Sequence, residues 1–355
     1  MKKLLFLFAI LPLLAQGQII ITVAGTGAEG YNGDGFAATA AKLWNPDAMT
    51  MDRAGNLYFN DGNNVRLRKI SPAYGGTITT IAGNGISGTT DDGVPATSTG
   101  CYTVDIAVDK HGNFFLADYN EHKIRKITTD GIIRTYAGTG TSGYNGDGMV
   151  ATTAQLNRPT GVTVDDTGNV YVADQQNYRI RKIDTFGIIT TVAGNGIAGY
   201  CFDGSKADTA TLRKLLLIRL DYSGRLYFTD NDRIRKLVGD GTIVTVGGNG
   251  TLGYSGDGGP ATAAKIFPAA MWIDSFNNVY IAESYNCKIR KIESDGTINT
   301  IAGMGGCGYG GDWEAALLAK VSSPYGIAVA ANGDVFIADK GNHRIRMITT
   351  HVTEV

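Results

Sequence analysis

The chain has 355 residues, a formal net charge of −1 and 49 glycines. Its length excludes a small disulfide-stapled scaffold, and the four cysteines are too few for a disulfide framework. Without a basic excess, nucleic acid is not an expected partner.

The first residues are typical of a secretory signal peptide. Two lysines follow Met1, an apolar run extends from Leu4 to Leu14, and Ala15-Gln16-Gly17 supplies small residues for cleavage. The run is shorter than the ~18 residues that a membrane-spanning helix needs. We therefore expect residues 1–17 to be a signal peptide, residues 18–355 to form one domain with no membrane span, and the protein to be secreted or periplasmic.

A unit of about 56 residues then occurs six times. One phrase, as in NVYVAD, ends at Asp61, Asp118, Asp174, Asp230, Glu283 and Asp339, and a second, as in YRIRKI, carries Arg68, Arg125, Arg181, Arg235, Arg290 and Arg346. Each unit contains four short runs of β-branched and aromatic residues, separated by glycine-containing turns. This pattern predicts four antiparallel strands per unit.

Six such units predict an all-β fold, a six-bladed β-propeller with four antiparallel strands per blade. A parallel solenoid is the alternative, but its repeats are usually shorter and lack paired hairpins. Residues 19–25 read as a fourth strand without its first three, and the last unit ends after three strands. We expect the N-terminal strand to close the last blade.

The recurring motifs AGNG, GYxGDGxxAT, PxGVxVDxxGNVYVAD and NxRIRKI give the chain a family resemblance. It resembles the NHL-repeat proteins in their secreted bacterial form, over essentially the whole mature chain. The resemblance implies a platform that binds proteins, nucleic acids or polysaccharides, and catalysis in some members.

The acidic residue that ends the second strand and the arginines of the third strand lie on neighbouring strands, where opposite charges pair. We interpret such pairs as structural. The pairs expected are Asp118 with Arg125, Asp174 with Arg179 or Arg181, and Asp339 with Arg346.

The long connections between units are candidates for a functional site. Five contain a tyrosine after a glycine, at Tyr31, Tyr144, Tyr200, Tyr254 and Tyr309, and all six contain an aspartate, at Asp34, Asp92, Asp147, Asp203, Asp257 and Asp312. The tyrosines suit contact with a glycan or peptide, and the aspartates are candidate ligands for Ca²⁺, the one cofactor considered. The alternative is that each aspartate caps its own turn.

The middle of the innermost strands is a second candidate site. The aligned residues are Thr50, Ala107, Thr163, Arg219, Trp272 and Ala328. A guanidinium over an indole would let Arg219 and Trp272 form one wall of a ligand pocket beside the channel, although simple packing between blades is the alternative. In addition, Cys287 and Cys307 are expected on one face, where a disulfide is feasible.

The histidines do not converge on the channel, and no Ser-His-Asp set is evident. We therefore expect a monomeric, non-catalytic platform that binds an extracellular protein or polysaccharide. The alternative is a Ca²⁺-dependent, lactonase-like hydrolase or a lyase. Its carboxylates would come from the ends of the inner strands, at Asp52, Asp109, Asp165, Asp221 and Asp274, which Asx turns also explain.

Overall fold

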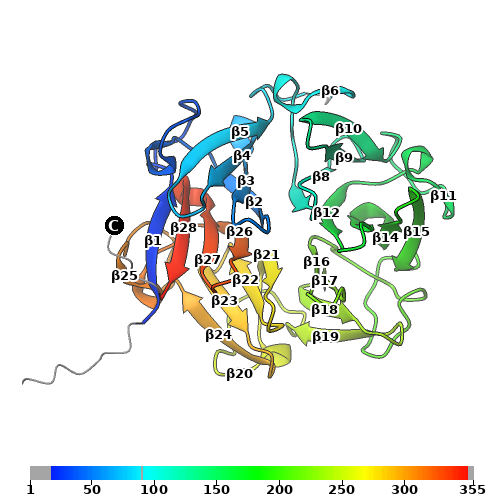
Figure 1. Cartoon of the computed structure of the whole chain (residues 1–355). Helices are drawn as coiled ribbons and strands as arrows, with labels where there is room; N and C mark the ends of the chain where they lie inside the picture. Colours follow the sequence, from blue (N-terminus) through cyan, green and yellow to red (C-terminus); the bar gives the residue numbers. More distant parts are fainter. Residues whose placement is uncertain (1–16, 89–90, 351–355) are drawn as a thin grey trace, which may run out of the picture.

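Six β-sheets stand around a central axis in the computed structural model, which describes residues 17–88 and 91–350 (Figure 1). Each sheet is antiparallel and forms one blade, as the repeats predicted. Nearly all of the expected signal peptide, residues 1–16, lies outside the described residues.

The blades follow the sequence repeats in order. Blade one contains β2 (Pro46–Met51), β3 (Leu57–Asp61), β4 (Arg66–Ser71) and β5 (Thr77–Ala82). Blade two contains β7 (Asp105–Val108), β8 (Phe114–Asp118), β9 (Lys123–Ile127) and β10 (Ile132–Ala137), and blade three contains β12 (Pro159–Val164), β13 (Val170–Asp174), β14 (Arg179–Ile183) and β15 (Ile188–Ala193). Blade four contains β16 (Ile218–Leu220), β17 (Leu226–Asp230), β18 (Arg233–Leu237) and β19 (Ile243–Gly247). Blade five contains β21 (Pro268–Ile273), β22 (Val279–Glu283), β23 (Lys288–Ile292) and β24 (Thr297–Ala302), and blade six contains β26 (Pro324–Val329), β27 (Val335–Asp339), β28 (Arg344–Thr349) and β1 (Ile19–Ala24).

Short elements complete the connections. The two-residue strands β6 (Val94–Pro95), β11 (Met149–Val150), β20 (Gly259–Pro260) and β25 (Glu314–Ala315) pair with the outermost strands of blades two, three, five and six. The 3-10 turns are η1 (Ala38–Ala40), η2 (Gly62–Asn64), η3 (Ala96–Ser98), η4 (Ala151–Thr153), η5 (Gln175–Asn177), η6 (Ala261–Ala263), η7 (Ala316–Leu318) and η8 (Lys340–Asn342).

The N-terminal strand closes the ring, as expected. β1 runs antiparallel to β28, and Ile20 lies opposite Ile348. Figure 1 shows the blue N-terminal strand beside the red strand of the last repeat. The Ile20 side chain is fully buried, so this strand adds apolar packing as well as backbone hydrogen bonds.

The hairpins between first and second strands are Asx turns. The Asp165 carboxylate accepts hydrogen bonds from the backbone N–H groups of Thr167 and Asn169, each at 2.9 Å. Gly168 between them has a φ of +96°, which glycine adopts without strain. The equivalent carboxylates of Asp52, Asp109, Asp221 and Asp274 make the same pair of bonds. The turn explanation of these five aspartates is therefore confirmed.

The hydrophobic core lies between neighbouring blades. Phe59 of blade one, for example, shares a buried cluster with Phe336 and Ala338 of blade six. Cys287 and Cys307 form a disulfide that ties the turn after β22 to the connection that leaves blade five. The faces of the sheets pack against neighbouring blades. The side chains that can contact a ligand therefore lie at the strand ends and along the channel.

Candidate functional site

A buried arginine lies in the third strand of every blade. These residues are Arg68, Arg125, Arg181, Arg235, Arg290 and Arg346. Each guanidinium lies 2.5–3.1 Å from the aspartate of the preceding long connection. In five blades it also lies 3.2–3.6 Å from the acidic residue that ends the second strand, and in blade two Arg125 interacts electrostatically with Asp118. We call this arrangement the blade clamp.

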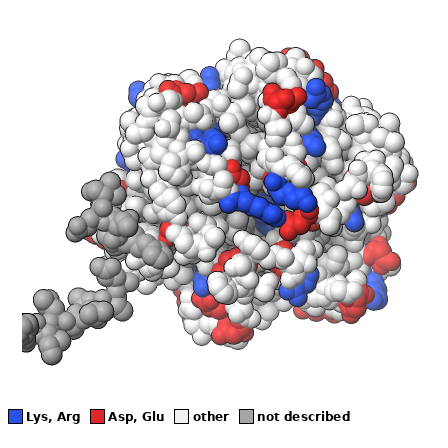
Figure 2. All heavy atoms as spheres, in the orientation of Figure 1, with Lys and Arg blue, Asp and Glu red and all other residues white. Residues whose placement is uncertain are grey.

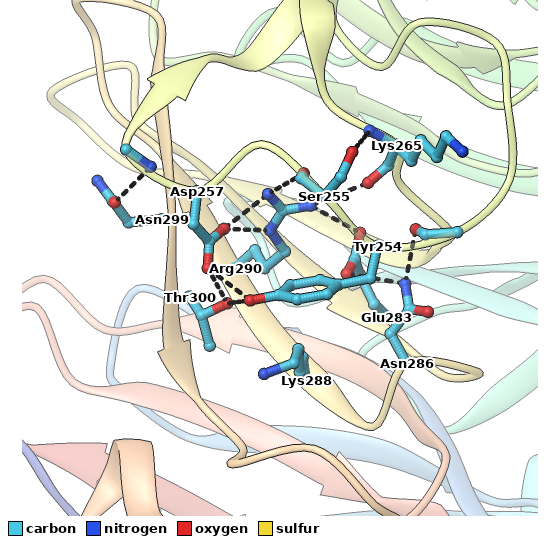
Figure 3. A network of polar contacts seen from close by, with 12 residues as sticks. Tyr254, Ser255, Asp257, Lys265, Glu283, Asn286, Lys288, Arg290, Asn299 and Thr300 are labelled. Carbon is cyan, nitrogen blue, oxygen red and sulfur yellow. Dashed lines mark hydrogen bonds and ion pairs between the residues drawn. The ribbon is translucent and has the colours of Figure 1, made fainter.

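Blade five shows the clamp in detail (Figure 3). Arg290 contacts Asp257 at 2.7 Å and Glu283 at 3.6 Å. The Tyr254 ring lies 5.0 Å from the guanidinium, and its hydroxyl donates to Asp257 at 2.7 Å. Thr300 of the outermost strand donates to the same carboxylate at 2.6 Å. The clamp therefore fastens a long connection to the sheet that follows it.

Burial shifts the pKa of the inner carboxylates upward. Desolvation raises the pKa of five aspartates to about 6, and their arginines and backbone donors offset only part of that effect. These residues are Asp61, Asp118, Asp174, Asp230 and Asp339. Desolvation also raises the pKa of Glu283.

The clamp changes the interpretation of several predicted residues. Asp174 contacts Arg181 at 3.5 Å, whereas Arg179 donates to the carbonyl oxygens of Asn177 and Asn195 and covers the Tyr144 ring. The five loop tyrosines each lie under basic side chains of the same blade. The six loop aspartates lie in separate clamps, and no group of three metal-ligating side chains forms within the described ranges. The structure therefore does not bring these tyrosines and aspartates into one site.

Arg219 has a different partner from the one expected. Its guanidinium makes two hydrogen bonds to the Asp105 carboxylate, at 2.7 and 2.8 Å, across the channel from blade four to blade two. Burial disfavours the charged guanidinium, but Asp105 more than offsets this and raises the pKa of Arg219. Among the described residues the guanidinium makes no cation–π contact with Trp272, although both side chains line one cavity. The partner differs from the expected one because of Asp105, the buried first residue of β7, which the repeat pattern does not single out.

An aromatic pocket of about 540 Å³ opens on the face where the long connections and the loops after the second strands meet. Its aromatic lining residues are Tyr102, Tyr119, Phe267, Tyr285 and Tyr325. The Phe267 and Tyr285 rings pack edge to face with centroids 4.4 Å apart. Tyr285 is 79% exposed, so most of its ring is free to contact a ligand. We call this site the loop-face pocket.

Two ion pairs lie in the loop-face pocket. Lys340 contacts Asp47 at 3.3 Å and covers the Tyr325 ring. Burial raises the pKa of Asp47, although Lys340 and Asn60 oppose the rise. The other pair is that of Arg219 and Asp105. Each charged side chain in the described lining therefore has an opposite partner within the pocket.

The two mouths of the channel are separate. Arg219 lines both the loop-face pocket and a second cavity on the side of the first hairpins, and its ion pair with Asp105 lies between them. Figure 2 shows one face of the ring, where charged side chains of both signs gather around a central hollow. Trp272 lines only the second cavity.

Comparisons with known proteins agree with this architecture. A family model described as the Teneurin NHL domain matches residues 139–199, and one described as the NHL repeat matches residues 322–346. Human Teneurin-4 is 30% identical over 353 residues, covering 88% of this chain, and SUPPRESSOR OF QUENCHING 1 of Arabidopsis thaliana is 25% identical, covering 93%. The chain spans only 12% and 27% of the lengths of these relatives.

Solved structures share the fold at low sequence identity. A protein from Bacteroides thetaiotaomicron, titled an auxiliary nutrient binding protein, has a TM-score of 0.67 at 16% identity, covering 94% of this chain and 76% of its own. Virginiamycin B lyase from Staphylococcus aureus has a TM-score of 0.51 at 16% identity, covering 86% and 94%.

Over residues 17–88 and 91–350, the structure contains no helix that is both long and apolar enough to span a membrane. The sequence repeats, the matched NHL models and the ring of six four-stranded blades lead to one assignment. The chain is a six-bladed β-propeller of the NHL-repeat family.

Proposed function

We propose that the protein is a secreted or periplasmic binding module that holds a neutral glycan in its loop-face pocket. The observation that carries this proposal is the set of exposed aromatic rings around the channel mouth. A sugar ring presents C–H groups that pack on an aromatic face and hydroxyls that need hydrogen-bond partners. Gln175, Ser284 and Thr160 lie in the same lining and supply such partners.

The charge pattern supports a neutral ligand over an acidic one. Lys340 and Arg219, the two cationic groups in the lining, are engaged by Asp47 and Asp105. A charged ligand would have to displace one of these partners and leave a carboxylate unpaired. The Bacteroides propeller of the same fold is described as a nutrient binding protein, which agrees with a binding role.

Calorimetric titration with neutral oligosaccharides of glucose, mannose and xylose tests the proposal. Tyr285→Ala removes one wall of the pocket and should weaken binding about tenfold. This is the affinity expected to be lost with one aromatic stacking contact and the area that it buries. Phe186→Ala is the control, because this ring is 88% exposed in a hairpin that does not line the pocket. Unchanged affinity of Tyr285→Ala, or heat from none of the sugars, would count against a glycan site here.

A further inference from the structure

The second cavity, on the side of the first hairpins, has a volume of about 480 Å³. We call it the hairpin-face cavity. The middle residues of five innermost strands line it, and these are Thr50, Ala107, Thr163, Arg219 and Trp272. The volume lies in the range of small-molecule sites in proteins. The Arg219–Asp105 ion pair separates it from the loop-face pocket.

Two threonine hydroxyls in this cavity have no hydrogen-bond partner among the residues that the structure describes. Thr50 and Thr163 are only 6% and 8% exposed, and neither hydroxyl hydrogen-bonds to any residue that the structure describes. The indole N–H of Trp272 also lacks an acceptor among the described residues, but this nitrogen is fully buried and is not exposed to the cavity. Neither threonine oxygen is among the buried atoms that lack a partner, so both are open to the cavity, where an occupant can exchange hydrogen bonds with them.

The remaining walls define the chemistry of that occupant. Ile106, Val162 and Ile273 contribute apolar surface. The two arginines in its described lining, Arg219 and Arg53, are each paired with an aspartate. The Asp165 and Asp221 carboxylates in the lining accept hydrogen bonds within their own turns. At the rim, Arg53 and Asp166 meet as an exposed ion pair between blades one and three. Such exposed pairs contribute about 0–1 kcal/mol, so this contact can open at little cost.

We propose that the hairpin-face cavity is a second ligand site, distinct from the loop-face pocket, for a small neutral molecule with an apolar body and hydrogen-bonding groups that meet Thr50 and Thr163. The site is built from blades that face one another across the channel. It does not depend on the identity of the loop-face ligand.

Saturation-transfer NMR with small neutral lactams and aromatic amides, followed by titration of those that bind, tests this site. The Thr50→Val, Thr163→Val double variant keeps the shape of both side chains and removes both hydroxyls. Its affinity for the bound probes should fall about tenfold for each hydrogen bond lost. Thr190→Val is the control, because this threonine is exposed on the outermost strand of blade three.

Ala107→Leu provides a second variant, which fills the cavity and should abolish probe binding. Tyr285→Ala should leave probe binding intact, which separates this site from the loop-face pocket. If no probe binds, the two hydroxyls serve only water and the proposal fails. It fails equally if probes bind the double variant and Ala107→Leu as tightly as they bind the unmodified protein.

Discussion

At the residue scale, each blade depends on one guanidinium that holds two carboxylates. In blade three, Arg181 is fully buried between Asp147 at 2.8 Å and Asp174 at 3.5 Å. Replacement by methionine keeps much of the side-chain volume but leaves the buried Asp174 without its counter-charge. We expect Arg181→Met to lower the free energy of unfolding by about 3–5 kcal/mol, as for other buried pairs that lose one member.

Urea unfolding followed by circular dichroism measures this change. Lys182→Met on the same strand is the matched control, because Lys182 is only half buried and makes no ion pair to a described residue. The control should stay within about 0.5 kcal/mol of the unmodified protein. Equal stability of the two variants would show that the clamp does not hold the blade together.

The blade clamp could be predicted from the sequence only in part. The pairing of Asp174 with an arginine follows from strand register, which places acid and base on adjacent strands. The second carboxylate comes from a connection 34 residues away, and strand register says nothing of it. The loop-face aromatics were missed because they do not repeat. Tyr285 does lie just after the acidic residue that ends a second strand, and this position could have indicated that it faces the channel mouth.

At the element scale, the closing strand β1 completes the last blade, beside the apolar packing and the ion pair that also join blades one and six. Removal of residues 18–25 would expose the edge of β28 and uncover Ile345 and Ile348, both fully buried in the intact protein. We expect loss of a single cooperative transition, or a Tm lower by more than about 10 °C, since several kcal/mol of apolar burial disappear. Differential scanning calorimetry measures both outcomes.

A pair of point variants controls for the deletion itself. Ile20→Ala removes a buried side chain of β1 and should destabilise by about 2–5 kcal/mol, whereas Ile19→Ala, at a half-buried position, should cost less. A deletion protein that melts cooperatively at an unchanged Tm would mean that the ring does not need this strand.

Elements were predicted well wherever the repeat specified them. The four strands of each blade follow from β-branched runs and turn residues that occur six times. The outer strands β6, β11, β20 and β25 were not predicted, because two residues carry no periodicity and pair only where the connection passes the blade. The loop-face pocket belongs to this second class, since it forms from segments far apart in the chain. Arg219 and Trp272, which the aligned inner strands placed beside the channel, do line the hairpin-face cavity.

At the scale of the whole molecule, the clamps make stability depend on pH. Five buried aspartates have a pKa of about 6 in the folded protein against an ordinary value of 3.8. Between about pH 4 and 6 the folded state therefore binds more protons than the unfolded state. By linkage, the free energy of unfolding falls as the pH rises through this window. Loop aspartates such as Asp92 and Asp257, whose pKa is lowered, act in the opposite direction only under more acidic conditions.

We therefore expect a higher Tm near pH 5 than near pH 7.5, because the same burial effect recurs around the ring. Calorimetric scans at constant ionic strength across this interval measure the slope. Asp61→Asn and Asp174→Asn together place permanently neutral groups in two clamps and should flatten the slope, whereas Asp130→Asn, in a fully exposed hairpin, should leave it unchanged. A Tm that rises from pH 5 to pH 7.5 would mean that the arginines outweigh burial and keep the inner carboxylates ionised.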